Sequence, residues 1–268
     1  MIGTCKLCLR DGVELQRSHL LSAAVYRILR DDGVVPNPNP VLITPEGRVQ
    51  SNQQQWAHLL CRSCEALLSR EGEDWVFRHG MKQDGRFPLA ELLRRSQPSV
   101  GTPGEHTRLY EAALIPGINV AAITHFAIGI FWKASVYGWN TDGSIPVNLA
   151  GYGDQFRRFL LGEADFPKDA VLAVLVREGG PIDRLTHTPA GSAGPDISIY
   201  QFPVPGFSFV LTIGRNISER VSQYCFVRGV GRPIVITVAT EQFLFQQAQQ
   251  AIERAQRPKA RTHRRPRS

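Results

Sequence analysis

The amino-acid sequence predicts an α+β fold, and three features of its 268 residues carry that prediction. Two Cys-x2-Cys pairs lie in the first quarter of the chain. Residues 112–132 contain no formally charged side chain, which is typical of a buried helix. Beyond residue 168, apolar runs rich in β-branched and aromatic residues alternate with Gly and Pro, which is typical of strands. We therefore expect an N-terminal unit built around the cysteines. A mixed α+β domain should follow it, with a mostly antiparallel sheet and a central apolar helix.

The N-terminal unit, residues 1–80, is expected to contain two helices and a hairpin. Apolar residues recur at helical spacing after Ser18, which suits an N-cap, and Gly33 suits the stop. Residues 35–51 carry four prolines and a Pro-Glu-Gly turn, which predicts a loop around one short hairpin. An apolar strand then leads into Cys61, and a helix begins near the last cysteine of the unit.

The second region, residues 105–253, follows a polar linker or long loop at 81–104. Residues 105–138 are predicted to be helical, with a Pro-Gly break. Their uncharged centre favours a buried core helix over a transmembrane span, because Pro, Gly, Asn, Thr and His lower its hydropathy and Lys133 follows at once. The remaining expected elements are a short helix near 153–167, strands at 170–176, 196–204, 207–214, 224–229 and 233–239, a hairpin at Pro203–Phe207, and a final helix from Thr240.

The formal charge of +7 is concentrated at the C-terminus. Residues 254–268 hold seven Lys or Arg and no acid, which predicts a solvated, disordered tail. Two interpretations stay open: a salt-sensitive hold on the phosphates of DNA or RNA, and a solubilising terminus without a partner. In the first interpretation the phosphate contacts come from Arg257, Lys259, Arg261, Arg264, Arg265 and Arg267.

The four paired cysteines, Cys5, Cys8, Cys61 and Cys64, predict a structural zinc site. Each pair forms a tight knuckle that presents two thiolates, and zinc favours four such ligands in a tetrahedron. A chance pattern and redox dithiols are the alternatives, but a thioredoxin-type dithiol would follow a strand in a βαβ unit, which this region lacks. No apolar segment follows a basic start at the N-terminus. We therefore expect no signal peptide, a cytoplasmic location and no membrane partner.

Around the cysteines the chain resembles a known family. The first Cys-x2-Cys pair, the segment Ser18-His19-Leu-Leu and the run Leu-Leu-Cys-x2-Cys-Glu65 are similar to the zinc-bound branch of the HNH endonucleases. The resemblance implies a treble-clef ββα-metal unit in which His19 is the general base that activates water against a phosphodiester. It also implies Mg²⁺ or Mn²⁺ near His19, which stabilises the leaving oxygen.

The sequence departs from the family pattern where that ion would bind. The usual Asn before the second cysteine pair is missing, and Glu65 replaces the His that follows the pair. Glu65 as an oxygen ligand and His58 as a nitrogen ligand are the candidate replacements. Equally, Glu65 suits the first turn of a helix without any metal, and His19 suits a residue that packs beside the zinc knuckle. Two hypotheses follow: a metal-dependent DNA endonuclease, and a catalytically degenerate zinc-stabilised module that binds nucleic acid or protein.

The second region resembles the C-terminal half of uncharacterised bacterial proteins that carry the same zinc unit, in the segments HFAIGIFWKASVYGW and GYGDQFRRFLLG. The resemblance implies a shared domain and no particular chemistry. The aromatic and basic residues of these segments either pack against the sheet, with the arginines solvated, or form a surface that holds nucleic acid. They are Trp132, Lys133, Tyr137, Trp139, Arg157 and Arg158. Cys225, alone in a predicted strand, is expected to be a small buried hydrophobe.

Overall fold

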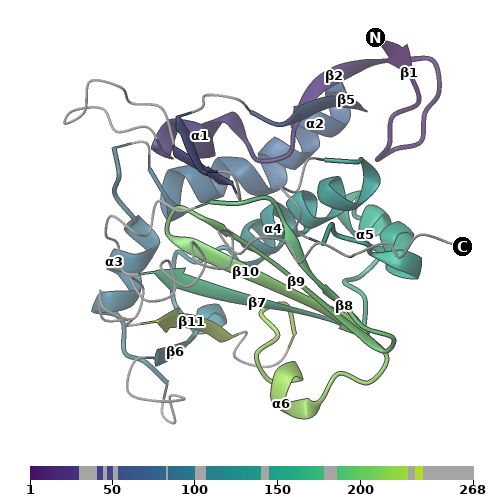
Figure 1. The fold of residues 1–268 in the computed structure, drawn as a ribbon. Helices are drawn as coiled ribbons and strands as arrows, with labels where there is room; N and C mark the ends of the chain where they lie inside the picture. Colours follow the sequence, from purple (N-terminus) through teal and green to yellow (C-terminus); the bar gives the residue numbers. More distant parts are fainter. Residues whose placement is uncertain are drawn as a thin grey trace, which may run out of the picture.

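The fold was obtained as a computed structural model. It describes residues 1–29, 41–44, 47–50, 54–82, 84–99, 107–139, 145–177, 186–228 and 233–237. For residues 41–44, 47–50 and 233–237 only the backbone is described. Within these residues the protein is α+β with mostly antiparallel sheets, as the sequence predicts (Figure 1).

The N-terminal unit is a small antiparallel sheet that runs directly into a helix. β1 (Ile2–Gly3) pairs with β2 (Val13–His19), and β2 pairs with β5 (Trp56–Cys61). α2 (Arg62–Leu68) begins at the residue after β5 ends. The segment between β2 and β5 holds α1 (Ala23–Leu29) and a separate hairpin of β3 (Val41–Thr44) and β4 (Gly47–Gln50). The predicted hairpin, and the strand that leads into Cys61, are confirmed.

The larger sheet has six strands, β6 (Thr107–Glu111), β7 (Ala170–Arg177), β8 (Ala190–Ala193), β9 (Ile197–Val204), β10 (Phe207–Gly214) and β11 (Pro233–Thr237). Their order in space is β6-β11-β7-β10-β9-β8, and only the pair β11 and β7 is parallel. The turn between β9 and β10 contains Gly206, whose φ of 77° favours glycine and where a β-carbon would overlap the ring of Phe87. This confirms the predicted hairpin and four of the five predicted strands.

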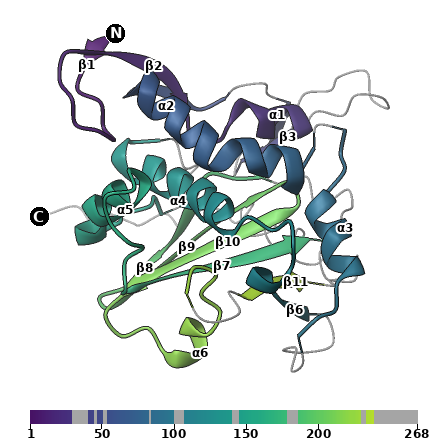
Figure 2. The ribbon, with the colours of Figure 1, turned by 180° about the vertical axis from the view of Figure 1, so that it is seen from behind.

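The central apolar helix, α4 (Val120–Val136), lies between the sheet and the N-terminal unit (Figures 1 and 2). Asn119 caps its first turn, since the side chain accepts a hydrogen bond of 2.9 Å from the backbone N–H of Ala122. Phe126 joins the layers, because its ring contacts both Phe77 of the N-terminal unit and Phe209 of the sheet. Since both sides of α4 are covered by protein, its apolar residues extend around the whole helix. None of the helices in the described ranges combines the length and apolarity needed to cross a bilayer.

Two π-helical turns extend α2 into the centre of the molecule. They are η1 (Ser69–Glu73) and η2 (Val76–Gly80), and η1 packs on α4. Gly72 is essential to this contact, because a β-carbon at that position would lie 2.7 Å from the backbone nitrogen of Phe126. The remaining described helices are α3 (Pro88–Arg95), α5 (Gly153–Leu160), α6 (Glu219–Ser222) and the 3₁₀ turns η3 (Ala112–Leu114) and η4 (Ala150–Tyr152). The short helix expected near 153–167 is therefore confirmed as α5.

Two of the sequence predictions for helices are wrong. Ser18 lies inside β2 and caps no helix; its buried hydroxyl accepts a hydrogen bond of 3.2 Å from the backbone N–H of Leu60, so pairing with β5 outweighs the local capping signal. Helix α1 starts at Ala23 instead. Residues 107–111, predicted to be helical, form β6 because β11 offers them a strand partner from far along the chain.

Two further predictions fail where the chain was expected to be a loop or a strand. The stretch expected as a linker holds α3, whose Leu89 and Leu93 are fully buried in the core. Cys225 is buried as expected, but it lies in a turn after α6 and not in a strand, and its N–H donates to Ser222 O. The final helix predicted from Thr240 and the basic tail lie outside the described residues.

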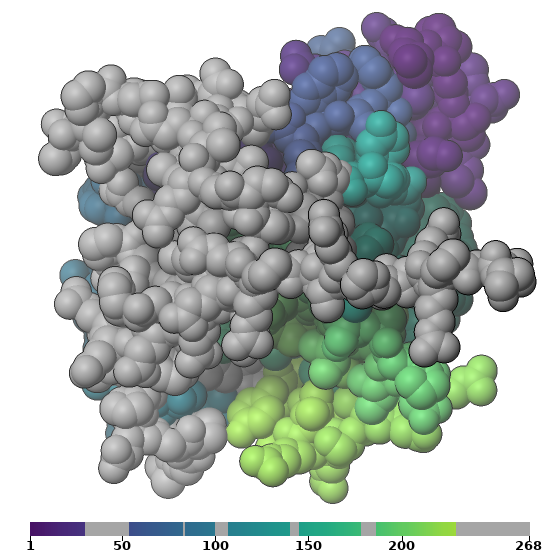
Figure 3. All heavy atoms as spheres, viewed as in Figure 1, coloured from purple at the N-terminus to yellow at the C-terminus, as the bar shows by residue number. Residues whose placement is uncertain are grey.

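Buried apolar side chains form one continuous cluster across the described residues. The cluster runs from Cys5 and Leu7 in the N-terminal unit, through α4, to Phe226, which follows α6 in the chain. In Figure 3 the N-terminal residues stand at one end of the molecule, next to segments from its middle. The N-terminal unit is therefore packed directly on the rest of the described protein.

Candidate metal centre

Local backbone structure explains how each cysteine pair is presented. The first pair lies on the turn between β1 and β2, which is closed by hydrogen bonds of 2.9 Å from Cys5 N–H to Arg10 O and from Leu9 N–H to Cys5 O. Leu9 has a φ of 59°, as the tight reversal of the chain requires. In the second pair, Cys61 is the last residue of β5 and Cys64 lies in the first turn of α2.

The four thiols converge on one point. Their sulfur atoms lie within 4.8 Å of one another, and the Sγ atoms of Cys8 and Cys61 are 3.8 Å apart. Four sulfurs that surround one zinc ion at about 2.3 Å are about 3.8 Å apart, so this donor set fits tetrahedral zinc. The only partly exposed cysteine of the four is Cys8, and the other three are buried. The cysteine cluster can therefore hold a structural zinc ion, as the spacing of the pairs predicts.

Polar groups around the cysteine cluster favour thiolates at two of its members. The guanidinium of Arg10 donates to Cys8 Sγ at 3.4 Å and to Cys61 Sγ at 3.7 Å, and it also holds the hydroxyl of Ser63 at 2.7 Å. Burial raises the pKa of Cys8, but hydrogen bonds from the side chain and backbone of Arg10 and from Cys5 and Cys64 together outweigh it, so the net pKa is lowered.

The two thiols of the second cysteine pair have pKa values that shift in opposite directions. Burial also acts to raise the pKa of Cys61, but hydrogen bonds from the Ser63 hydroxyl and the Cys64 N–H bring it down to about 6. Burial raises the pKa of Cys64, and the nearby Cys5 raises it further. The buried Cys5 thiol also has a raised pKa, caused by burial. Cys61 is thus available as a thiolate at neutral pH, the lowered pKa of Cys8 favours its thiolate, and binding of a metal ion would release the remaining protons.

His19, the expected general base, lies at the end of β2 beside α4. Its backbone carbonyl accepts a hydrogen bond of 2.8 Å from the ammonium of Lys133, a side chain that is almost completely buried. Burial lowers the pKa of the His19 imidazole, and the charges of Arg17 and Lys133 lower it further, while Glu65 opposes them. His19 is therefore neutral at pH 7 and able to accept a proton.

The two candidate ion ligands are placed differently. In the first turn of α2, Glu65 has a buried Oε1 atom without a hydrogen-bond partner among the described residues. His58, on β5, donates from Nδ1 to the carbonyl of Leu15 at 3.2 Å, which leaves Nε2 as the free nitrogen. Within the described ranges, the cysteine cluster is the only group of three or more His, Cys, Asp or Glu residues close enough to hold an ion. The packing of α2 on β2 thus places Glu65 within electrostatic range of His19, but the described residues do not assemble a complete second ligand set.

Several residues singled out from the sequence do not form a binding surface. Trp132 and Trp139 are buried, which confirms core packing for these two aromatic residues, and Lys133 is buried with them, whereas Tyr137 is exposed. Arg158 is solvated as that interpretation expects, but Arg157 is not, because it is mostly buried and reaches from α5 to the carbonyl of Leu7 at 3.1 Å. The six cations of the tail, Arg257, Lys259, Arg261, Arg264, Arg265 and Arg267, lie outside the described residues.

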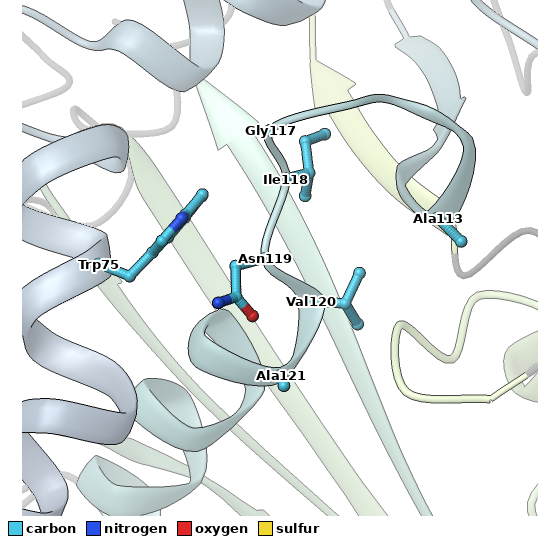
Figure 4. Close-up of a pocket in the computed structure, with 7 residues that line it drawn as sticks. All are labelled: Trp75, Ala113, Gly117, Ile118, Asn119, Val120 and Ala121. Carbon is cyan, nitrogen blue, oxygen red and sulfur yellow. The ribbon is translucent and has the colours of Figure 1, made fainter.

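A separate pocket of about 550 Å³ opens beside Trp75 (Figure 4). The chain that leads into α4 forms its opposite side, with Ile118, Asn119 and Val120. Its lining residues carry no ionisable side chain, and the amide of Asn119 is already used to cap α4. The pocket therefore offers no group for acid–base catalysis.

The sequence did not predict three polar contacts of this region. Arg10 and Ser63 were not recognised as neighbours of the cysteines, and Lys133 was not recognised as a partner of the N-terminal unit. Arg10 and Ser63 follow a cysteine by two residues each, which is the only signal that points to them. The contact of Lys133 with His19 joins residues 114 positions apart and leaves no local pattern.

Comparison of the chain with family models, curated proteins and solved structures finds no match.

Proposed function

We propose that the protein is a zinc-stabilised nuclease of the HNH type, in which the N-terminal unit is a treble clef and His19 is the general base. The order of elements supports the treble clef: a turn with two cysteines, the antiparallel pair β2 and β5, and a helix whose start carries the other two cysteines. The observation that carries the proposed activity is the buried carboxylate oxygen of Glu65, which lacks a partner in the described protein and lies on α2, the helix that packs against the strand of His19.

Each residue of this site has a role in phosphodiester hydrolysis. The neutral His19 imidazole takes a proton from water as the water oxygen bonds to phosphorus, and the bond from phosphorus to the leaving oxygen breaks. Glu65 and the free Nε2 of His58 are the groups that would hold Mg²⁺ or Mn²⁺. The cation, when bound, stabilises charge on the leaving oxygen. The hydrogen bond of His58 to Leu15 O fixes its ring, as is usual for histidines that bind metals.

A second candidate function is a non-catalytic binding module, and the position of Lys133 favours it. Its buried ammonium lies 2.8 Å from the carbonyl of His19 and 4.0 Å from a carboxylate oxygen of Glu73. A permanent cation at this point supplies positive charge that a catalytic ion supplies in a nuclease. In that case the zinc site serves stability alone, and the protein binds nucleic acid or another protein without cleaving.

Cleavage of supercoiled plasmid DNA by the zinc-loaded protein, with Mg²⁺ or Mn²⁺, separates the two functions. We expect nicking that falls by about 10²- to 10⁴-fold in His19→Ala, the usual contribution of a general base. Glu65→Gln should weaken activation by the divalent ion. The matched control is His79→Ala, which removes an exposed histidine of η2. Cleavage that persists in His19→Ala, or a wild-type protein that carries zinc and does not cleave, rejects the nuclease.

A further inference from the structure

The exposed face of the β2–β5 pair carries a cluster of aromatic and basic side chains. In the antiparallel register, Arg17 lies opposite His58, and His19 lies opposite Trp56. Residues that are directly opposite, or two apart on one strand, point to the same face of a sheet. These four side chains therefore share one face, and Trp56 is 40% exposed there.

Three of these residues form an ordered platform. The guanidinium carbon of Arg17 lies 3.9 Å from the centre of the Trp56 ring, and the His58 ring meets the Trp56 ring edge-on, with the centroids 5.6 Å apart. The hydrogen bond from His58 to Leu15 O holds that ring in place. Contacts from Arg17 and His58 thus hold the Trp56 ring before any ligand arrives, which reduces the entropy cost of binding.

Arg17 is exposed and makes no ion pair among the described residues; its guanidinium lies instead on the ring of Trp56. A guanidinium stacked on an aromatic ring keeps its N–H donors free at its edge, and these donors match the oxygens of a phosphate. A protein surface would need a carboxylate to match this cation, whereas every nucleotide supplies a phosphate next to an aromatic base. The charge and the aromatic ring together therefore favour nucleic acid over a protein partner.

We infer that the platform of Arg17, Trp56 and His58 binds a single strand of nucleic acid, with a base on Trp56 and a phosphate on Arg17. Stacking on an aromatic side chain needs an unpaired base, which selects single strands over duplex. This inference rests on the proposed function in one respect: since Trp56 is opposite His19, the bound strand brings its phosphodiester to the proposed base.

The test is the affinity of the full-length, zinc-loaded protein for a fluorescently labelled single-stranded oligonucleotide, measured by anisotropy without Mg²⁺ or Mn²⁺. We expect Trp56→Ala to raise the dissociation constant by about 5- to 150-fold, the usual contribution of one stacked base. Trp56→Phe should retain most of the affinity, and Arg17→Ala should weaken binding and reduce its salt dependence. Duplex of the same sequence should bind more weakly than the single strand.

Tyr137→Ala and Arg158→Ala are the matched controls, since both residues are exposed and belong to the second region. Every variant keeps the basic tail, so any binding through the tail remains in all of them. Equal affinity of Trp56→Ala and wild type, a loss confined to the two controls, or no binding by the wild type overturns the inference. Binding that depends on Trp56, in a protein that does not cleave DNA, supports the platform and rejects only the proposed nuclease.

Discussion

Arg10 is a residue outside the four cysteines that contacts the candidate zinc site directly. A zinc ion with four thiolates carries a net charge of −2, and one guanidinium here contacts two of the sulfur atoms. N–H donors of this kind spread the negative charge and hold the thiolates at the distances the ion requires. Because Arg10 also holds Ser63, it links the turn of the first pair to the start of α2.

We therefore expect Arg10→Ala to weaken zinc binding by about 10- to 100-fold, the range found for groups that orient metal ligands. Arg10→Lys should restore only part of the affinity, since one ammonium cannot reach both sulfurs with the geometry of the fork. Competition with a chromophoric zinc chelator measures the change. Lys6→Ala, an exposed cation of the same turn, is the control. Identical zinc affinities for Arg10→Ala and Lys6→Ala contradict this role.

The burial of His125 predicts that the free energy of unfolding depends on pH. The His125 ring on α4 donates from Nε2 to Leu160 O, and its buried Nδ1 has no partner in the described protein. Burial lowers its pKa, and the hydrogen bond to Leu160 only partly opposes this. The unfolded state then binds more protons than the folded state just below the ordinary histidine pKa of about 6.5. The free energy of unfolding must fall as the pH drops through that range.

His125→Gln removes the titrating group and keeps a donor for Leu160 O. We expect the variant to lose less stability than wild type between about pH 7 and pH 5, with up to one proton fewer taken up on unfolding. Urea unfolding at a series of pH values gives this number from the slope of the free energy against pH. Parallel pH profiles for the two proteins would show that His125 does not couple folding to acid.

At the scale of single residues, the sequence predicts the metal ligands but little of what surrounds them. The cysteines are recognisable because their spacing follows from local knuckle geometry. The buried oxygen of Glu65, the stacking of Arg17 on Trp56 and the ammonium of Lys133 depend on which strands and helices meet. Contacts of that kind leave no pattern along the chain.

At the scale of elements, the crossing of η1 and α4 depends on one glycine. Gly72 brings the backbone of η1 so close to α4 that a β-carbon would lie 2.7 Å from the nitrogen and 2.9 Å from the α-carbon of Phe126. Backbone atoms cannot move aside as a flexible side chain can. Gly129, on α4 itself, is a contrasting case, because a β-carbon there would lie 3.7 Å from Leu68, an ordinary contact.

We expect Gly72→Ala to lower the free energy of unfolding by about 1–3 kcal/mol through overpacking. Gly129→Ala should instead raise it by up to about 1 kcal/mol, because alanine is the better helix former. Chemical denaturation of both variants measures these changes with the same method. A Gly72→Ala variant as stable as Gly129→Ala would mean that the two helices separate easily.

Elements with a strong internal pattern were predictable, and those set by distant partners were not. The apolar length of α4 and the β-branched runs of β7, β9 and β10 identify them without further information. Ser18 was predicted to cap a helix and residues 107–111 to be helical, because their local signals favour those roles, but each pairs with a strand from elsewhere in the chain. Helix α3 was missed because its short apolar stripe stands among polar residues.

At the scale of the whole molecule, two cations connect the N-terminal unit to the helices beneath it. Arg157 of α5 donates to Leu7 O, inside the turn of the first cysteine pair, and Lys133 of α4 donates to His19 O. The continuous apolar cluster passes through the same boundary. The sequence predicts the two regions in the right order, but it contains no local signal that they share a core.

Because of this connection, we expect that removal of zinc changes the stability of segments outside the metal site. A metal ion bound only by the folded state stabilises that state, so removal by a strong chelator should lower the melting temperature. Because Leu7 lies between two ligands and accepts from Arg157, the loosening should extend from the cysteine turn into α5. We expect hydrogen exchange to increase in both segments, and to change less in β9 and β10, which pair only within the larger sheet.

Two controls make the zinc-removal experiment decisive. Metal analysis must show that the ion has left the protein, and zinc added back should restore both the melting temperature and the exchange pattern. In Arg157→Ala, which lacks the link to Leu7, removal of zinc should affect the cysteine turn and leave the exchange of α5 unchanged. Melting that stays the same after proven removal contradicts a structural zinc ion. Faster exchange confined to the turn in wild type would keep the zinc site but reject its coupling to α5.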